Sequence, residues 1–149
     1  MLNASYVGRS LPTSDPVAIT PASVTRFAQA LGLDDAMQMY GSQASPRPAV
    51  PPTYLISLTL PAAEALKDDP EFGLDWSRVL HRDQRFAYHR ELQAGAEVAC
   101  TVTVESIKTV AGNDLLSLRT DVTDAEGLVA EVWTTLFVAG DSVVAGDPA

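Results

Sequence analysis

The stretch Pro51-Pro52-Thr53-Tyr54-Leu55-Ile56-Ser57-Leu58-Thr59-Leu60 decides the fold, because it has the pattern of a helix that is apolar on nearly every side. The helix is expected to begin near Pro52-Thr53, and Pro61 either kinks it or begins a new turn over residues 62–67. A helix that is hydrophobic all round is buried rather than placed on the surface. The rest of the chain must therefore supply a layer that covers it.

The second half of the chain has the pattern of strands. From residue 79 onward the hydrophobic period changes to two, and apolar residues alternate with polar ones over residues 97–105. Turns at residues 111–114 and 124–127 separate two further strands. The last one, over residues 128–138, is apolar on both faces, which predicts an interior place in the sheet. Because the sheet must curl to bury the helix, we expect an α+β fold in which a curved antiparallel β-sheet wraps around a long apolar helix.

The first third of the chain predicts two short elements. Residues 5–9 have the pattern of a short strand, and Thr20-Pro21 has that of an N-cap and first residue of a helix, which Gly32 ends. The length of 149 residues suits one domain with a core of its own. We expect a single domain over residues 1–140 and a flexible C-terminal tail over residues 141–149.

Composition argues against several classes of protein. The formal net charge of −9 argues against a general nucleic-acid-binding protein, because phosphate contacts need a basic surface. No apolar run approaches the roughly 20 residues that span a bilayer, and the N-terminus lacks the pattern of a signal peptide. A single cysteine suits a reducing compartment. We therefore expect a cytoplasmic protein that contacts neither nucleic acid nor membrane. With no metal-ligand spacing and no phosphate-binding loop, we expect no metal and no cofactor.

The stretch Val79-Leu80-His81-Arg82-Asp83-Gln84-Arg85-Phe86, with the residues that follow it to Arg90, concentrates polar side chains in an acidic chain. It holds both histidines of the protein and three of its ten basic residues, which indicates a polar site. Together with Leu92, Gly95 and Val98, this stretch resembles the MaoC-like dehydratase family. It is most similar to the non-catalytic, N-terminal type domain of R-specific enoyl-thioester hydratases and 3-hydroxyacyl-thioester dehydratases.

Two short motifs carry the resemblance. His81 and Gln84 match a Leu-His-Gly-Glu-Gln run of that domain, whereas Asp83 stands for its glutamate and Arg82 replaces its glycine. Pro51-Pro52-Thr53-Tyr54 is similar to the Pro-Pro-Thr-Phe with which such domains open their central helix. The resemblance extends over most of the chain and implies a single hot-dog domain.

The resemblance also shows what this chain lacks. Catalytic members of the family carry a Gly-Asp-x-Asn-Pro-x-His loop after the first helix, and its aspartate and histidine are the acid and base that add or remove water. On residues 32–38 this motif places Leu33 at the aspartate position and Gln38 at the histidine position. No histidine precedes His81. The usual dyad is absent, and the resemblance implies a chain that pairs with a homologous, dyad-bearing hot-dog subunit.

Four residues are candidates for catalysis if the chain has an activity of its own: His81, His89, Asp34 and Asp35. In a regular strand the two histidines share one face with Asp83, as expected of acid–base groups near a thioester. The alternative interpretation is a pair of histidines that hydrogen-bond structurally between strands. The adjacent aspartates lie in the loop where relatives keep their dyad, and a solvated surface loop explains them equally well.

Five residues are candidates for substrate binding: Gln84, Arg82, Arg85, Tyr54 and Tyr40. The Gln84 amide either donates to a thioester carbonyl or satisfies a dimer contact. The arginines either meet the phosphates of coenzyme A or the acidic face of a carrier protein, or they pair with the abundant carboxylates. The tyrosines either line an acyl tunnel or pack in the core.

Three functions are open on this basis. The first is a subunit of an R-3-hydroxyacyl-thioester dehydratase or enoyl-thioester hydratase that shapes the acyl pocket while its partner supplies the dyad. The second is a stand-alone thioester enzyme, either a thioesterase or a lyase that adds a nucleophile to an unsaturated thioester. The third is a non-catalytic module that binds acyl thioesters. In each case the ligand is an acyl-CoA or acyl-carrier-protein thioester, and the free edge of such a sheet predicts a homodimer or a heterodimer.

Overall fold

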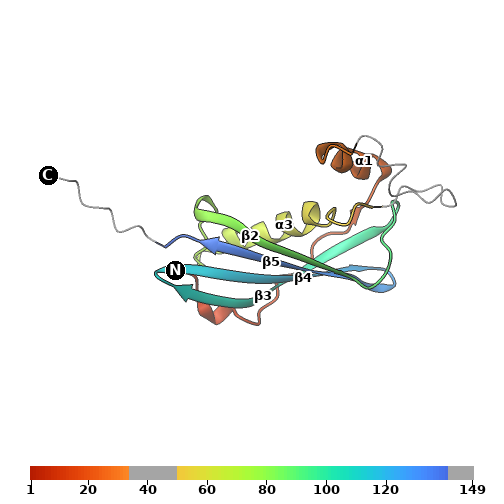
Figure 1. The fold of residues 1–149 in the computed structure, drawn as a ribbon. Helices are drawn as coiled ribbons and strands as arrows, with labels where there is room; N and C mark the ends of the chain where they lie inside the picture. Colours follow the sequence, from red (N-terminus) through yellow and green to blue (C-terminus); the bar gives the residue numbers. More distant parts are fainter. Residues whose placement is uncertain (34–49, 141–149) are drawn as a thin grey trace.

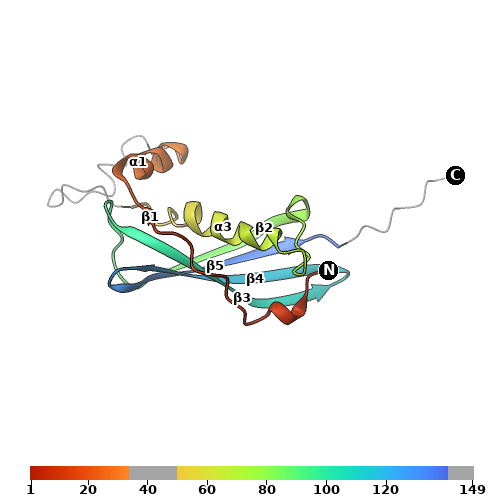
Figure 2. The same ribbon diagram turned by 180° about the vertical axis from the view of Figure 1, so that it is seen from behind.

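A computed structural model of the protein describes residues 1–33 and 50–140. Its strands form one antiparallel sheet in the order β1-β3-β4-β5-β2, and helix α3 lies on one side of that sheet (Figures 1 and 2). The strands are β1 (Val17–Ala18), β2 (Val79–Tyr88), β3 (Glu97–Val110), β4 (Asn113–Asp124) and β5 (Gly127–Val138). The helices are α1 (Pro21–Ala30) and α3 (Ile56–Glu64). This arrangement confirms the predicted α+β architecture.

The three longest strands follow one another along the chain and pair in that order. Strand β5 lies between β4 and β2, which confirms the interior place predicted from its two apolar faces. The hairpin between β3 and β4 turns at Ala111 and Gly112, whose φ angles are 49° and 78°. Two consecutive positive φ angles are what a tight two-residue hairpin requires, and glycine adopts this conformation without strain.

Residues 5–9 do not form the short strand that their pattern predicts. The Asn3 side chain accepts a hydrogen bond from the Ser5 amide at 3.0 Å, and this cap starts a 3-10 turn over Ala4–Tyr6. The chain then runs beside β3, where the Leu11 amide donates to a β3 carbonyl at 2.8 Å. A local hydrogen bond from a side chain thus outweighs a short alternating pattern.

Helix α1 begins where the sequence predicts. The Thr20 hydroxyl accepts from the Ser23 amide at 3.0 Å, and the Ser23 hydroxyl accepts from the Thr20 amide at 3.1 Å, which is a capping box. Pro21 occupies the first helical position, and Gly32, with a φ of 74°, follows the helix end. Within the described ranges, no helix is long and apolar enough to cross a membrane.

Helix α3 is fully buried on one flank only. Leu55 and Thr59 are 0% and 1% exposed and face the sheet, whereas Ser57 and Pro61 on another side are exposed. The prediction of a helix buried on every side is therefore wrong for this chain by itself. A single curled sheet reaches only one flank of the helix, as Figure 2 shows from the helix side.

The bounds of α3 also differ from the expected ones. Residues 52–55 form turns, so the helix begins at Ile56. It continues through Pro61 to Glu64, and the new turn is a 3-10 turn over Ala65–Asp68. Proline removes a backbone hydrogen bond inside a helix, and packing of the buried flank keeps the helix intact across that position.

The core consists of two apolar clusters with threonines between them. On β4, Leu118 belongs to one cluster and Val122 to the other, and the buried Thr120 lies between the two. Thr134 of β5 and Thr59 of α3 are buried at equivalent positions between the clusters. We refer to Thr59, Thr120 and Thr134 as the threonine belt.

The threonine belt predicts that two similar substitutions change the free energy of unfolding in opposite directions. The Thr134 hydroxyl donates to Gln84 Oε1 at 3.1 Å, whereas the Thr59 hydroxyl has no hydrogen-bond partner within the described residues. A methyl group in place of an unpaired buried hydroxyl removes a desolvation cost, while loss of a paired hydroxyl leaves its acceptor unsatisfied. We expect Thr59→Val to raise the free energy of unfolding by about 1 kcal/mol and Thr134→Val to lower it by about 1 kcal/mol in urea denaturation. A Thr59→Val protein less stable than the wild type would contradict this account.

Candidate functional site at the free edge of the sheet

Strand β2 forms one edge of the sheet, and its far side pairs with no strand among the described residues. Its pairing with β5 shifts between His81 and Asp83, so Arg82 forms a β-bulge. His81 lies opposite Leu136, whereas Asp83 lies opposite Thr135. One extra residue exchanges the two faces for every side chain that follows it.

The bulge separates the two histidines. His81 is on the helix side of the sheet, because the residue opposite it, Leu136, is a core residue. His89 lies just beyond the strand, and its Nε2 is 2.9 Å from Oε2 of Glu131 on the other side of the sheet. The prediction that both histidines share one face is wrong, because Arg82 interrupts the period of two.

Each histidine ring has a local partner. His81 Nε2 is 3.2 Å from the carbonyl oxygen of Asp83, and His89 contacts the Glu131 carboxylate. Glu131 also lies 4.0 Å from the Arg119 guanidinium. Both histidines are exposed, and the structure does not bring them together in one cavity. Any acid–base role for either one stays a prediction.

A pocket of about 450 Å³ opens at the end of β2, and it is lined by Val50, Pro52, Tyr88, His89, Arg90, Glu91 and Leu92. The Tyr88 phenol donates to the Pro52 carbonyl at 2.7 Å, and burial raises the pKa of Tyr88 to about 12. Tyr88 is therefore un-ionised at neutral pH. Of the described candidate residues, His89 alone lines this pocket.

Gln84 lies on the helix side of β2, opposite Thr134. The Thr134 hydroxyl donates a hydrogen bond to Gln84 Oε1. The Nε2 of Gln84 is buried and has no acceptor within the described residues. Phe86 and Tyr88 follow on the same side, with ring centroids 6.5 Å apart. This side of the edge strand therefore presents an aromatic strip and one unused hydrogen-bond donor.

The arginines predicted to bind an anionic ligand do not lie together, and each has different neighbours. The Arg85 guanidinium lies 3.7 Å from the ring centroid of Trp133, a cation–π contact on the outer side of the sheet. Arg82 is exposed at the bulge and forms no ion pair with any described residue. Of the candidates for an anionic ligand, Arg82 thus has the guanidinium with the fewest contacts.

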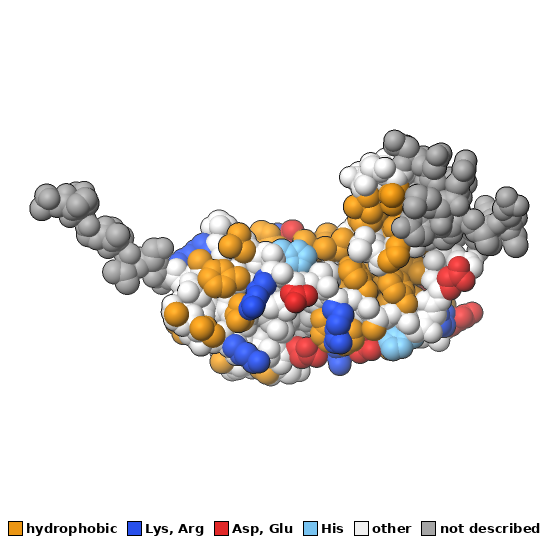
Figure 3. Space-filling view, in the orientation of Figure 1, with side chains coloured by type: hydrophobic (Ala, Val, Ile, Leu, Met, Phe, Trp, Pro, Cys, Tyr) orange, Lys and Arg blue, Asp and Glu red, His pale blue; other side chains and the backbone are white. Residues whose placement is uncertain are grey.

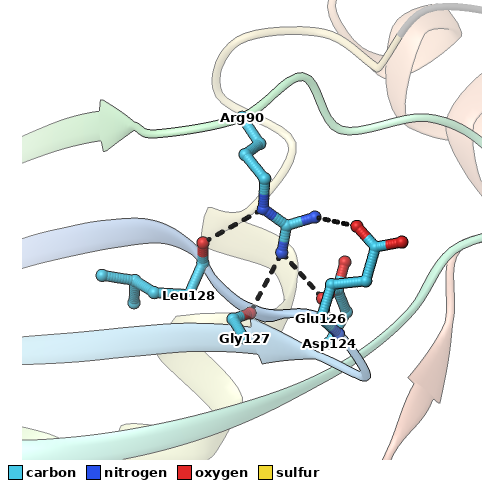
Figure 4. Close-up of polar contacts among 5 residues, drawn as sticks. All are labelled: Arg90, Asp124, Glu126, Gly127 and Leu128. Carbon is cyan, nitrogen blue, oxygen red and sulfur yellow. Dashed lines mark hydrogen bonds and ion pairs between the residues drawn. The ribbon is translucent and has the colours of Figure 1, made fainter.

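Arg90 is held by the turn between β4 and β5 (Figure 4). Its guanidinium forms ion pairs with Asp124 at 2.7 Å and Glu126 at 3.2 Å. It also donates to the carbonyls of Gly127 at 3.1 Å and Leu128 at 3.3 Å. These contacts tie the end of β2 to the neighbouring hairpin, so Arg90 has a structural role.

The contact between Arg90 and Asp124 predicts a pH dependence. The hydrogen bond from Arg90 lowers the pKa of Asp124, so the carboxylate stabilises the fold above the unfolded-state pKa of about 3.9. This contribution is lost as the pH falls through the lower pKa of the folded state. We expect Arg90→Gln to lower Tm at pH 7, and the difference from the wild type to shrink below about pH 3.9. Circular dichroism melts between pH 7 and pH 3 measure this.

The matched control is Arg82→Gln, because it removes the same charge from an exposed arginine that has no ion pair within the described ranges. We expect this variant to keep the wild-type Tm at each pH. A Tm difference for Arg90→Gln that stays constant across the pH range would contradict the role of Asp124.

Tyr54 is buried between the two helices. Its hydroxyl lies 2.8 Å from the Ser23 hydroxyl, and its ring meets Phe27 edge-on at a centroid distance of 5.4 Å. It therefore ties α1 to the start of α3, and a role in an acyl tunnel stays a prediction. The remaining candidates lie outside the described residues: Asp34, Asp35 and Tyr40.

Sequence reasoning missed a groove between α3 and the N-terminal segment. Two adjoining hollows, of about 380 and 360 Å³, share Ser14, Pro61, Ala62 and Cys100 in their linings. The signal in the sequence is the small size of Ala62 and Ala65, which leaves space beside the helix. Burial raises the pKa of Cys100 to about 11, so its thiol is neutral at pH 7. Among the described residues, no cluster of three or more His, Cys, Asp or Glu suits a metal ion.

Comparison with known proteins identifies the family. The model of the family described as "FAS1-like, dehydratase domain region" matches residues 5–132. The chain belongs to this family. Together with the solved MaoC-like dehydratases that share the fold, this match confirms the resemblance inferred from the two motifs.

Two relatives of this chain are similar to it over nearly their whole length. The UPF0336 protein of Streptomyces coelicolor is 42% identical over 142 residues, which cover 91% of this chain and 93% of that protein. The UPF0336 protein of Thermobifida fusca is 38% identical over 149 residues, which cover 95% of this chain and 96% of that protein.

Solved structures share the fold. A chain of the C-terminally truncated HadBC (3R-hydroxyacyl-ACP dehydratase) complex of Mycobacterium tuberculosis matches with a TM-score of 0.71 at 23% identity, covering 89% of this chain and 96% of that chain. The MaoC-like dehydratase of Rhodospirillum rubrum matches with a TM-score of 0.63 at 14% identity, covering 92% and 94%. These matches confirm the hot-dog fold.

Proposed function

We propose that this chain is the dyad-less subunit of an R-3-hydroxyacyl-thioester dehydratase and pairs with a hot-dog partner that carries the catalytic aspartate and histidine. The observation that carries the proposal is the edge of β2, which pairs with no strand among the described residues, beside the flank of α3 on which Ile56 and Leu60 are only partly buried. An unpaired strand edge is a template for pairing with another strand. A homologous subunit supplies both a strand for the edge and a second helix for the flank.

The positions of the histidines support a partner that performs the chemistry. Removing water from a 3-hydroxyacyl thioester needs a base for the Cα proton and an acid for the Cβ hydroxyl, both beside one substrate. His81 and His89 lie on opposite sides of the sheet, and no other histidine exists in the chain. In this proposal the partner's dyad removes the proton and protonates the leaving hydroxyl.

The contribution of this chain is a wall for the acyl thioester and for the partner. By helical spacing, Ile56 and Leu60 project from the flank of α3 that faces away from the groove beside Ser57 and Pro61, and this flank looks toward β2. Together with the aromatic strip of β2 they form an apolar surface. The Gln84 amide adds one donor, for an acceptor on the partner or for the thioester carbonyl.

The comparisons support the substrate class in this proposal. The HadBC complex, one chain of which matches over 96% of its length, is described as a 3R-hydroxyacyl-ACP dehydratase. An acyl thioester with a 3-hydroxyl group is therefore the substrate class that we propose, with its acyl chain held between the two subunits.

Reconstitution tests the proposal. The loss of enoyl-thioester absorbance during hydration of a trans-2-enoyl thioester is followed for the chain alone, for a dyad-bearing hot-dog partner alone, and for the mixture. We expect no turnover by the chain alone and at least a tenfold gain for the mixture over the partner alone. Turnover by the chain alone would favour a stand-alone enzyme and contradict the proposal.

Two matched variants locate the interface. Leu60→Asp places a charge on the flank of α3 toward β2, whereas Ser57→Asp places the same charge beside the groove. Both positions are at least partly exposed, so both variants are expected to fold. We expect Leu60→Asp to abolish co-elution with the partner in size-exclusion chromatography and Ser57→Asp to retain it. Equal effects of the two variants would place the interface elsewhere.

A further inference from the structure

The chain between Tyr6 and Ile19 is anchored at both ends and loosely attached in between. Tyr6 is buried, and its hydroxyl donates to the Asp69 carboxylate at 2.6 Å. Ile19 is fully buried, and its amide donates to the Ala96 carbonyl at 2.8 Å. None of residues 7–18 is buried. We refer to residues 7–18 as the strap, which Figure 2 shows in dark red as it runs past α3 to β1.

The strap forms one wall of the groove beside α3. Both hollows of that groove are lined by Pro61 and Ala62 of α3, by Cys100 of β3 and by Ser14 of the strap. Four further residues of the strap line one hollow or the other: Leu11, Pro12, Asp15 and Val17. If the strap moved away from β3, the two hollows would become one open groove between α3 and β3.

Backbone hydrogen bonds attach the middle of the strap to the edge of β3 at a few points. The Ser14 amide donates to the Cys100 carbonyl at 2.9 Å, and the Cys100 amide donates to Ser14 Oγ at 3.0 Å. The Leu11 amide donates to the Val102 carbonyl at 2.8 Å. Pro12 has no amide hydrogen to donate. Ser14 is therefore the residue that ties the strap to β3 directly over the groove.

The remaining attachments are polar and open to water. The hydroxyls of Ser10 and Thr103 are 2.7 Å apart, those of Thr13 and Thr101 are 2.8 Å apart, and both pairs are exposed. Figure 3 shows charged side chains of both signs on the face of the molecule opposite to that of Figure 2. The strap itself has two charged residues, and neither forms an ion pair with the described residues: Arg9 and Asp15. Water replaces such exposed hydrogen bonds at little cost.

We propose that the strap opens as a unit from β3 while the sheet stays folded, and that this opening controls entry into the groove beside α3. Segments with few buried side chains and exposed hydrogen bonds open locally at a lower free energy than the whole domain. The buried anchors Tyr6 and Ile19 confine the movement to the residues between them. The strap lies at the β3 edge of the sheet, whereas the proposed partner joins the β2 edge, so the two proposals are tested separately.

The single cysteine of the chain is a reporter for this opening, because Cys100 lines the groove and is only 4% exposed. The probe is a small, neutral aromatic disulfide. The Cys100 thiolate attacks one sulfur of the probe, a mixed disulfide forms, and the other half leaves as a coloured thiolate. We expect the folded wild type to be labelled at a rate that depends only weakly on low concentrations of urea, because a local opening exposes little surface.

Two variants of the strap are expected to accelerate labelling. Ser14→Ala removes the hydroxyl that accepts from the Cys100 amide, and we expect a rate about fivefold higher, as for the loss of one hydrogen bond. Thr13→Val removes an exposed hydroxyl pair, and we expect a smaller increase because water satisfies Thr101. Rates at two pH values check that the pKa of the Cys100 thiol is the same in each variant.

The matched control is Ser77→Ala, which removes an exposed hydroxyl that donates to Asp75 at 2.6 Å in the 3-10 turn before β2. We expect this variant to be labelled at the wild-type rate. Equal acceleration by Ser77→Ala and Ser14→Ala would show a general loosening of the fold and overturn the proposal. Labelling with the full urea dependence of global unfolding would overturn it as well, and so would labelling of the wild type as fast as that of the unfolded chain.

Discussion

The packing of one flank of α3 against one curled sheet is the contact on which the rest of the structure depends. Leu55 and Leu66 of this helical segment are fully buried, and they join the two apolar clusters of the sheet's inner side. A single sheet of this width cannot also enclose the other sides of the helix. The partly buried flank of α3 toward β2 and the free edge of β2 are therefore two results of the same geometry, and in the proposed assembly one homologous subunit covers both.

Polar atoms inside this core also support the proposed assembly. The threonine belt divides the apolar interior, and Gln84 continues it toward the free edge with a buried amide that lacks an acceptor among the described residues. Buried polar groups make pairing with a partner more specific. A partner that leaves a buried donor or acceptor without a hydrogen bond binds less favourably than one that satisfies it. In the proposed assembly these groups would lie near the interface with the partner subunit.

Much of the fold could be predicted because it depends on local patterns. The N-cap at Thr20, the turn at residues 111–114 and the two apolar faces of β5 each depend on a few neighbouring residues, and the structure agrees with all three. The candidate site was less predictable, since it depends on pairing between distant segments. The partners of Arg90 lie more than thirty residues later in the chain, and nothing near Arg90 in the sequence indicates them.

The bulge at Arg82 has a consequence for how this family diverges. Adding or removing one residue at this position would exchange the two sides for a whole segment of β2, although the composition of the strand would hardly change. A duplicated subunit can therefore lose or regain a set of inward-facing groups through a single codon insertion or deletion, rather than through many substitutions. Alignments that place a gap freely within this strand would assign equivalent roles to side chains that face opposite surroundings.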